Sequence, residues 1–253
     1  MTDPLAPLGA APARAALFLD FDGVLAEIAP RPELATIRPG LAGVVGALAE
    51  RLGRVAVVSG RPVDFLVTML PAHVDLVGLY GLERRIDGAH STVADAEPWR
   101  VLIATAVGDA GEAFGAAVVE PKGVSLTVHY RNDDDLRVPM EQWARDTAAR
   151  TGLDWRPAKR SFELHPPLHL DKGTAVAELG AGHDPVAYVG DDLGDLPAFD
   201  GLDRLADDGA TTVRVAVRGD EAPDELLARA DHVVDGTAGA EVVLRDLLDR
   251  LGG

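Results

Sequence analysis

Two aspartates, Asp20 and Asp22, follow an apolar run that begins near Ala15 and is typical of a buried strand. Residues two apart in an extended chain point to the same side, so both carboxylates should leave the end of this strand together. Like charges held this close repel each other unless one group takes up a proton or a cation lies between them. The pair is therefore a candidate for chemistry, although a strand that simply ends in an acidic turn has the same pattern.

Two more apolar runs end in polar clusters. One run leads into Ser59-Gly60-Arg61, and the other leads into Gly190-Asp191-Asp192-Leu193-Gly194-Asp195, which on its own is equally consistent with an acidic turn. Loops at the carboxyl ends of neighbouring parallel strands form one crevice, where up to five carboxylates would meet if these strands are neighbours. That concentration of charge requires a divalent cation such as Mg²⁺ and an ammonium group, which Lys172 can supply. The candidate metal-site residues are Asp20, Asp22, Asp191, Asp192 and Asp195.

Strands and helices alternate around these clusters. Helical spacing over Pro39–Gly53 precedes the strand at Arg54, and Pro62 is placed to open a helix that runs to about Leu70 and whose first N–H groups attract anions. A third strand is predicted over Val74–Leu79. This alternation is typical of a parallel α/β sheet covered on both faces, and it returns after Asp171 with strands at 185–189 and 212–217 and helices at 174–179 and 241–251.

The middle of the chain has a different pattern. Helices are predicted over Pro98–Gly115 and Leu136–Thr151, and hairpin-type strands over Ala116–Tyr130 and Asp154–His165, which together indicate an inserted α+β unit with an antiparallel sheet. Strand alternation leaves one open polar face, which is usually only solvated but can also cover a polar ligand. That face carries His129, Arg131, Glu163 and His165. Lys122 joins it only if Gly123 forms a bulge or the strand begins later.

These patterns predict a flexible leader over 1–14, a core made of 15–86 and 170–253, and an inserted unit over 87–169. The chain has 253 residues with 24 Lys and Arg against 41 Asp and Glu, a net charge of −17 that argues against nucleic-acid binding. The absence of cysteine excludes disulfides, thiolate metal sites and cysteine nucleophiles. Without a signal-peptide pattern or an 18-residue apolar run, we expect a soluble cytoplasmic protein with no membrane partner.

The core motifs together resemble those of haloacid-dehalogenase (HAD) type phosphotransferases. DFDGVL, VVSGR, Lys172 and VGDDLGD occur in the order that this superfamily uses. A narrower resemblance is to the trehalose-6-phosphate phosphatases. It rests on Tyr80–Glu83 in the core, on Glu120-x-Lys122, His129–Arg131 and Phe162–Pro166 in the inserted unit, and on Asp171-Lys172-Gly173 after it. The resemblance implies an α/β fold with a HAD-like doubly wound parallel sheet core and an inserted α+β cap domain of the C2 type. Val24 and Gly194 depart from the family's usual threonines.

The resemblance also implies roles for single residues. Asp20 would attack phosphorus and form an aspartyl-phosphate, Asp22 would act as acid and base, and Ser59 with Lys172 would hold the phosphoryl oxygens. Mg²⁺ would be held by Asp20, the backbone carbonyl of Asp22, and Asp191, with Asp192 or Asp195 behind them. The inserted unit would act as a lid over the substrate. The candidate sugar contacts are Glu120, Lys122, His129, Arg131 and Glu163, with Arg61 and Glu83 at the rim.

The expected activity is Mg²⁺-dependent hydrolysis of trehalose 6-phosphate to trehalose and phosphate. A different sugar phosphate, such as sucrose phosphate or mannosyl-phosphoglycerate, is an alternative substrate because fold and motifs define the reaction better than the substrate. A third interpretation is a sugar-phosphate sensor that binds without turnover. The intact set of Asp20, Asp22, Lys172 and Asp191 counts against a sensor, which has no use for a nucleophile paired with an acid.

Overall fold

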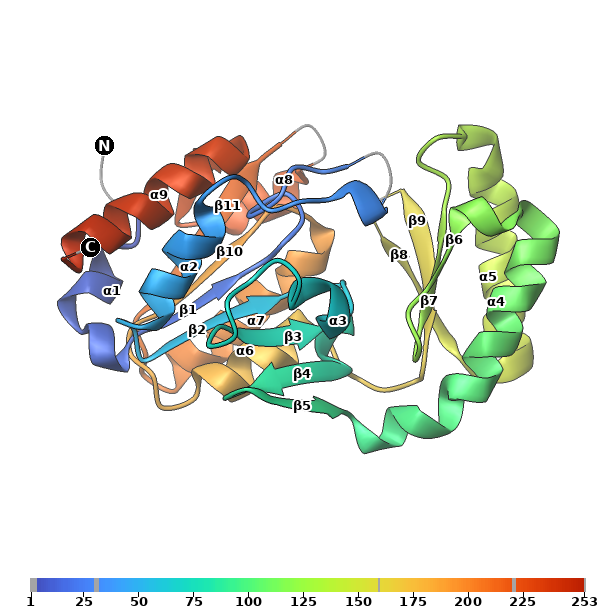
Figure 1. Ribbon diagram of the computed structural model, residues 1–253, viewed down its shortest axis with the longest axis horizontal. Helices are drawn as coiled ribbons and strands as arrows, with labels where there is room; N and C mark the ends of the chain where they lie inside the picture. Colours follow the sequence, from blue (N-terminus) through green and yellow to red (C-terminus); the bar gives the residue numbers. More distant parts are fainter. Residues whose placement is uncertain (1–3, 30–31, 159, 220–221, 253) are drawn as a thin grey trace. The chain divides into compact units, whose positions relative to one another are not determined.

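The computed structural model describes residues 4–29, 32–158, 160–219 and 222–252, and it divides the chain into two compact units (Figure 1). The core unit comprises residues 1–91 and 170–253, and the inserted unit comprises residues 92–169. The first boundary lies at 91 rather than at the expected 86 because strand β4 is followed by β5, which continues the core sheet.

The core unit is built on an eight-stranded sheet in the order β12-β11-β10-β1-β2-β3-β4-β5. All pairs from β12 to β3 are parallel, and β4 pairs with β3 in the antiparallel sense. The strands are β1 (Ala16–Leu19), β2 (Arg54–Val58), β3 (Asp75–Gly78), β4 (Glu83–Ile86), β5 (Ala89–Thr92), β10 (Val186–Gly190), β11 (Thr212–Arg218) and β12 (His232–Asp235). The predicted doubly wound parallel sheet is confirmed.

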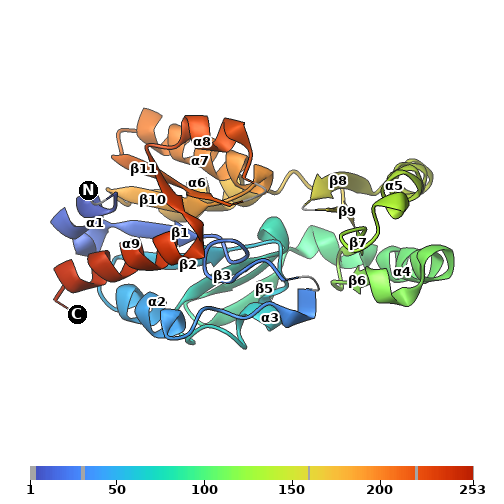
Figure 2. The same cartoon turned by 90° about the horizontal axis from the view of Figure 1, so that it is seen from above.

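Helices cover both faces of this sheet (Figure 2). Leu17 and Leu19 of β1 pack in one apolar cluster, and Phe18 packs in the other, because successive strand residues point to opposite faces. The first cluster includes α1 (Ala6–Ala10), α2 (Leu41–Ala49), α3 (Val63–Leu66) and α9 (Gly236–Arg250). The second includes α6 (Lys172–Gly180), α7 (Leu196–Asp207) and α8 (Asp224–Arg229).

The expectation of a flexible leader is wrong for residues 4–14. This segment forms α1 and a 3₁₀ turn at Pro12–Arg14, and its Leu5 and Leu8 side chains are fully buried in the same cluster as α9. Burial of two leucine side chains stabilises the packed segment by roughly 3–6 kcal/mol before the cost of ordering the backbone. The alanine and proline content of this segment concealed those two apolar contacts.

Helices α7 and α8 were not predicted, and α3 ends at Leu66 rather than near Leu70. Helix α7 contains one glycine, Gly201, which has a packing role, and Pro197 lies in its first turn, where proline is tolerated. A Cβ atom on Gly201 of α7 would lie 2.6 Å from the backbone oxygen of Gly173, so these two glycines allow α6 and α7 to pack closely. Helix α6 begins at Lys172 because Asp171 and Thr174 form a reciprocal capping box.

The inserted unit is a four-stranded antiparallel sheet, in the order β6-β7-β9-β8, with two helices packed on its apolar face. Its elements are α4 (Arg100–Phe114), β6 (Val119–Pro121), β7 (Leu126–His129), α5 (Arg137–Thr151), β8 (Asp154–Ala158) and β9 (Ser161–His165). Leu126 and Val128 face the helices as the alternation predicts. Short 3₁₀ turns complete the two units at Pro32–Leu34, Leu79–Gly81, Ala94–Trp99, Ala116–Val118, Asp134–Leu136 and Leu193–Asp195. None of the helices in the described ranges is sufficiently long and apolar to cross a membrane.

Candidate active site

The three strands whose ends carry the predicted motifs are neighbours in the core sheet. Strand β1 lies between β10 and β2, so Asp191, Asp20 and Ser59 follow the carboxyl ends of adjacent parallel strands. The Asp20 N–H donates a hydrogen bond to the Val189 carbonyl at 2.9 Å, which ties the end of β1 to that of β10. All three polar side chains are buried. The predicted convergence of separate strand ends at one edge of the sheet is confirmed.

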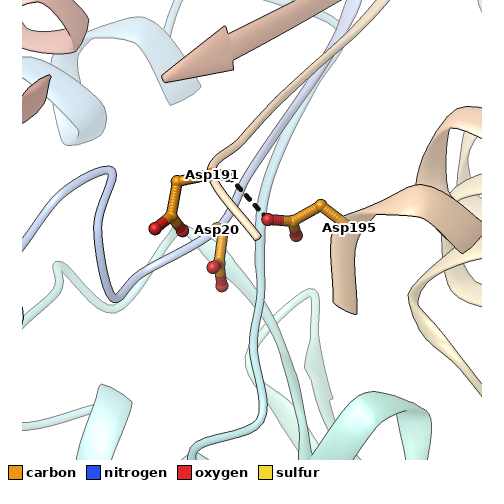
Figure 3. A group of neighbouring side chains, drawn as sticks. All are labelled: Asp20, Asp191 and Asp195. Atoms are coloured by element: carbon orange, nitrogen blue, oxygen red, sulfur yellow. Dashed lines mark hydrogen bonds between the residues drawn. The ribbon is translucent and has the colours of Figure 1, made fainter. Parts of the chain in front are cut away.

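Three buried carboxylates form a compact cluster at this edge. One oxygen atom each from Asp20, Asp191 and Asp195 lies within 4.8 Å of the others (Figure 3). Burial raises the pKa of the Asp20 carboxyl well above its usual range, since Lys172 opposes that rise only partly and the neighbouring carboxylates add to it. The cluster therefore has a deficit of positive charge and only oxygen donors, which fits a hard divalent cation.

Asp195 holds this part of the site together. Its Oδ2 accepts hydrogen bonds from the backbone N–H groups of Asp191 and Asp192, at 2.7 and 3.0 Å. Its Oδ1 accepts from Lys172 Nζ and from the Tyr188 hydroxyl, both at 2.6 Å. A carboxylate has about four acceptor positions, so these four donors fill them. Asp195 thus orients its neighbours, and the ligand oxygens left for a metal ion belong to Asp20 and Asp191.

Asp192 has a comparable local role. Its Oδ1 accepts the Gly194 N–H at 2.8 Å and caps the 3₁₀ turn Leu193–Asp195, in which the Asp195 side chain returns a bond to the Asp192 N–H. This capping box explains the spacing of the acidic motif, because the turn brings Asp195 back under the strand end. Gly190 is required for the same reason, since a Cβ atom there would lie 2.4 Å from the Asp195 carboxyl carbon.

Lys172 reaches the site from the start of α6. Its Nζ lies 2.9 Å from Asp20 Oδ1 and 2.6 Å from Asp195 Oδ1, and its side chain is buried. Burial opposes the charge more than any other single effect, but Asp195 and Asp20 together raise the pKa of Lys172 well above its usual value. The ammonium is therefore charged, and it is shared between the predicted nucleophile and Asp195.

Gly23 makes the close approach of the two strand ends possible. Its φ is +86°, and a Cβ atom on it would lie 2.1 Å from Asp191 Oδ2. We expect Gly23→Ala to weaken the binding of a divalent cation to this carboxylate cluster at least about tenfold, because Asp191 must move away. The measurement is a calorimetric titration of the protein with Mg²⁺.

Gly88→Ala is the matched control for this prediction. Gly88 has a similar φ of +78°, but a Cβ atom there meets nothing within 4 Å. Both substitutions introduce left-handed backbone strain of about 1–2 kcal/mol, and Gly23→Ala adds the clash with Asp191, so its melting temperature should fall further. If Gly88→Ala weakened Mg²⁺ binding as much as Gly23→Ala does, backbone strain rather than the Asp191 contact would be the cause.

Asp22 points toward Arg61 in this structure. Arg61 donates from Nε to Asp22 Oδ2 and from Nη2 to Asp22 Oδ1, both at 2.7 Å, and its guanidinium lies 4.8 Å from the ring centre of Phe65. Such a paired, planar geometry fixes both side chains. The sequence placed Arg61 at the substrate rim, and the structure shows in addition that it binds the predicted acid and base.

Ser59 and Glu83 also have defined partners. The Ser59 Oγ accepts the Arg61 N–H at 3.2 Å, beside the turn that carries Gly60. Glu83 Oε2 accepts the Val63 N–H at 2.9 Å, at the first residue of α3. The start of this four-residue helix thus attracts an anion, as the sequence predicts, and the anion is the Glu83 carboxylate of the same chain.

The predicted polar residues of the inserted unit lie together in that unit. His129 Nε2 is 2.8 Å from Glu120 Oε2, and Lys122 Nζ is 3.7 Å from the same oxygen. Strand β6 ends at Pro121 and Gly123 has a φ of +76°, so Lys122 lies in the turn and is free of the strand alternation. This is the arrangement that the sequence required for Lys122 to join the polar face.

Glu163 completes this group. It lies opposite Thr127 in the β7–β9 register, and Thr127 lies opposite Glu120 in the β6–β7 register. Burial alone would raise the pKa of the Glu163 carboxyl, but Arg156, at 3.0 Å, and Lys122 together hold it below the usual value. Arg131 lies in the turn that follows β7.

Two site residues were missed in the sequence. Arg156 lies directly across from Glu163 in the β8–β9 register, a signal that the strand assignment contained but that was not used. Tyr188 lies three positions before Asp191 in an otherwise apolar strand. Its hydroxyl group was the only indication in the sequence of a polar partner.

The fold is that of the HAD type phosphatases. A phosphatase of that superfamily from Bacteroides thetaiotaomicron shares the fold, with a TM-score of 0.52 at 15% identity over 94% of the chain and 95% of the structure. The chain belongs to the trehalose-phosphatase family, a family of phosphoric monoester hydrolases, because the model of that family matches residues 18–231.

Individual relatives agree with this assignment. A probable trehalose-phosphate phosphatase of Sinorhizobium fredii is 33% identical over 210 residues, which cover 79% of the chain and 77% of the relative. The trehalose-6-phosphate phosphatase of Escherichia coli is 30% identical over 246 residues, 91% of the chain and 88% of the relative. The C-terminal domain of the C. albicans trehalose-6-phosphate phosphatase shares the fold, with a TM-score of 0.79 at 21% identity over 98% and 97% of the two chains. Two much longer mycobacterial relatives, described as uncharacterized glycosyl hydrolases, match over 15% of their length.

Proposed function

We propose that this protein is a Mg²⁺-dependent phosphatase that hydrolyses trehalose 6-phosphate through an aspartyl-phosphate on Asp20. The observation that carries the proposal is the position of the Lys172 ammonium, 2.9 Å from Asp20 in a cluster with Asp191. A pure sugar-phosphate sensor has no need for a carboxylate held between an ammonium group and a metal site. Family membership supports the sugar phosphate as the substrate class.

Asp20 and Asp191 would hold the metal ion, together with the backbone carbonyl of Asp22. When bound, Mg²⁺ supplies positive charge that offsets the repulsion between these carboxylates and the phosphoryl group. Ser59 and Lys172 would donate hydrogen bonds to the phosphoryl oxygens and stabilise charge that develops on them. Asp195 is not needed as a direct ligand, because both of its oxygens accept hydrogen bonds within the protein, and one oxygen of Asp192 caps the adjacent 3₁₀ turn.

In the first step an Asp20 carboxylate oxygen forms a bond to phosphorus while the bond from phosphorus to the sugar oxygen breaks. Asp22 donates its proton to the departing sugar oxygen and becomes a carboxylate. In the second step water attacks phosphorus, Asp22 accepts the water proton, and the Asp20–phosphorus bond breaks to release phosphate. The Asp22 carboxylate is paired with Arg61 in this structure, which suits the second step, in which Asp22 accepts a proton. For the first step, in which Asp22 donates a proton, this ion pair must open.

Residues of the inserted unit are proposed to contact the sugar hydroxyls. Glu120, Lys122, His129 and Glu163 form a polar group in which Glu120 lies next to both His129 and Lys122, and such a group can both accept and donate hydrogen bonds. Arg131 is proposed as an additional donor at the edge of this group. A cytoplasmic location stays a prediction from the sequence.

A phosphate-release assay over a panel of sugar phosphates tests the proposal. We expect Mg²⁺-dependent release from trehalose 6-phosphate, with kcat/KM at least about tenfold above that for sucrose phosphate or mannosyl-phosphoglycerate, and loss of release in excess EDTA. A preference for another member of the panel would change the substrate but keep the reaction. No release from any member with Mg²⁺ present would favour the sensor.

A further inference from the structure

Tyr188 takes no part in the chemistry described above, yet its hydroxyl group enters the active-site cluster. The residue lies in β10, its side chain is fully buried, and its hydroxyl donates to Asp195 Oδ1 at 2.6 Å. This bond places Tyr188 at the start of a chain of polar contacts. The chain runs from the Tyr188 hydroxyl through Asp195 and Lys172 to Asp20, the predicted nucleophile.

The ring of Tyr188 lies in an otherwise apolar environment. It belongs to the cluster that contains Phe18, Ala198 and Phe199, and it meets the Phe199 ring edge-on with a centroid distance of 6.3 Å. A phenylalanine would fill this space equally well. A hydroxyl group in such an environment is costly unless it has a hydrogen-bond partner, so its purpose is best sought in the bond to Asp195.

The two oxygens of Asp195 serve different parts of the site. Oδ2 accepts the backbone N–H groups of Asp191 and Asp192 and so supports the proposed metal side. Oδ1 accepts Lys172 Nζ and the Tyr188 hydroxyl. Because the hydroxyl occupies one acceptor direction of Oδ1, the ammonium is limited to the other, and from there it also reaches Asp20 Oδ1 at 2.9 Å.

We propose that Tyr188 is a positioning residue that acts through Asp195 to hold the Lys172 ammonium against Asp20. This inference rests on the proposed function, in which Asp20 receives the phosphoryl group. Without the hydroxyl, Oδ1 has only Lys172 as a donor, so the ammonium moves toward Asp195 and away from Asp20. The hydrogen bond from the Tyr188 hydroxyl goes to Asp195, through which it acts on Lys172.

The test is Tyr188→Phe, assayed with p-nitrophenyl phosphate and Mg²⁺ so that sugar recognition plays no part. We expect kcat to fall about tenfold, the scale of a lost hydrogen bond to a charged group, with KM and the Mg²⁺ half-saturation within about twofold of the wild type. The unchanged Mg²⁺ dependence is expected because the Oδ2 side of Asp195 keeps its two N–H donors. A purely structural role would not produce this split between kcat and the other two constants.

Phe199→Leu is the matched control, since it loosens the packing around the same ring and leaves the hydroxyl in place. It should lower the melting temperature more than Tyr188→Phe does, with kcat within about twofold. Equal kcat for Tyr188→Phe and the wild type, or an equal fall in both variants, would overturn the inference. A wild type that releases phosphate from neither p-nitrophenyl phosphate nor trehalose 6-phosphate would instead contradict the proposed function.

A crystal structure of Tyr188→Phe gives a readout that does not depend on turnover. We expect Lys172 Nζ to lie beyond hydrogen-bond distance of Asp20 Oδ1 and to remain bonded to Asp195. An ammonium group that keeps both contacts without the hydroxyl would refute the positioning role, whatever the activity.

Discussion

Asp20→Asn should lower kcat for phosphate release at least about 10³-fold, because an amide cannot form the phosphoryl bond that divides the hydrolysis into two steps. The asparagine keeps the shape of the side chain, and its amide oxygen can still lie against the Lys172 ammonium, which is 2.9 Å from Oδ1. Steady-state release from trehalose 6-phosphate at saturating Mg²⁺ is the measurement. Turnover close to that of the wild type would exclude Asp20 as the nucleophile.

Asp20→Asn also tests how the Asp20 charge affects the stability of the fold. Burial raises the pKa of Asp20 in the folded state, so the ionised carboxylate destabilises the fold at pH values above its unfolded pKa. Removing that charge should leave the melting temperature in EDTA equal to or above that of the wild type. Glu241→Gln is the control, because hydrogen bonds from Arg38 and Arg245 lower the pKa of the Glu241 carboxyl in α9, so its ionised form stabilises the fold. It should keep full activity and lose stability.

The parts of the fold that could be predicted from the sequence are those that depend on short-range patterns. A buried parallel strand is an apolar run, and its end is visible where polar residues begin, so Asp20, Ser59 and Asp191 were placed correctly at strand ends. Parallel pairing then brings these ends to one edge whatever the details of the helices. The antiparallel sheet of the inserted unit was visible for the same reason, through its alternation of apolar and polar residues.

The remaining features depend on long-range packing, which short-range sequence patterns do not reveal. Asp22 pairs with Arg61, and Glu83 accepts the Val63 N–H. Both contacts depend on the directions that side chains take in the folded protein. Helix α7 contains residues that usually interrupt helices, and it forms because Gly201 can pack on α6. Leu5 and Leu8 acquire their role only when α9 lies beside them, so the segment looked like a leader.

The Lys172 ammonium group contributes both to the proposed chemistry and to the stability of the core. Its ammonium is the positive charge, apart from a bound metal ion, that offsets the buried carboxylates of Asp20 and Asp195. Lys172 is also the neighbour that most strongly lowers the pKa of Asp195 against the effect of burial. Asp195 in turn fixes the backbone that carries Asp191. Loss of the ammonium therefore affects both the phosphoryl site and the metal side.

Lys172→Met should lower kcat at least about 10³-fold and, unlike Asp20→Asn, should also destabilise the fold by about 3 kcal/mol, because a buried carboxylate loses its charged partner. With the ammonium gone, burial dominates and raises the folded pKa of Asp195 above its unfolded value. Stability then falls as the pH rises through the carboxyl range, so the deficit in melting temperature, measured in EDTA, should be smaller at pH 5 than at pH 8. A deficit independent of pH would mean that the lysine stabilises the core through packing alone.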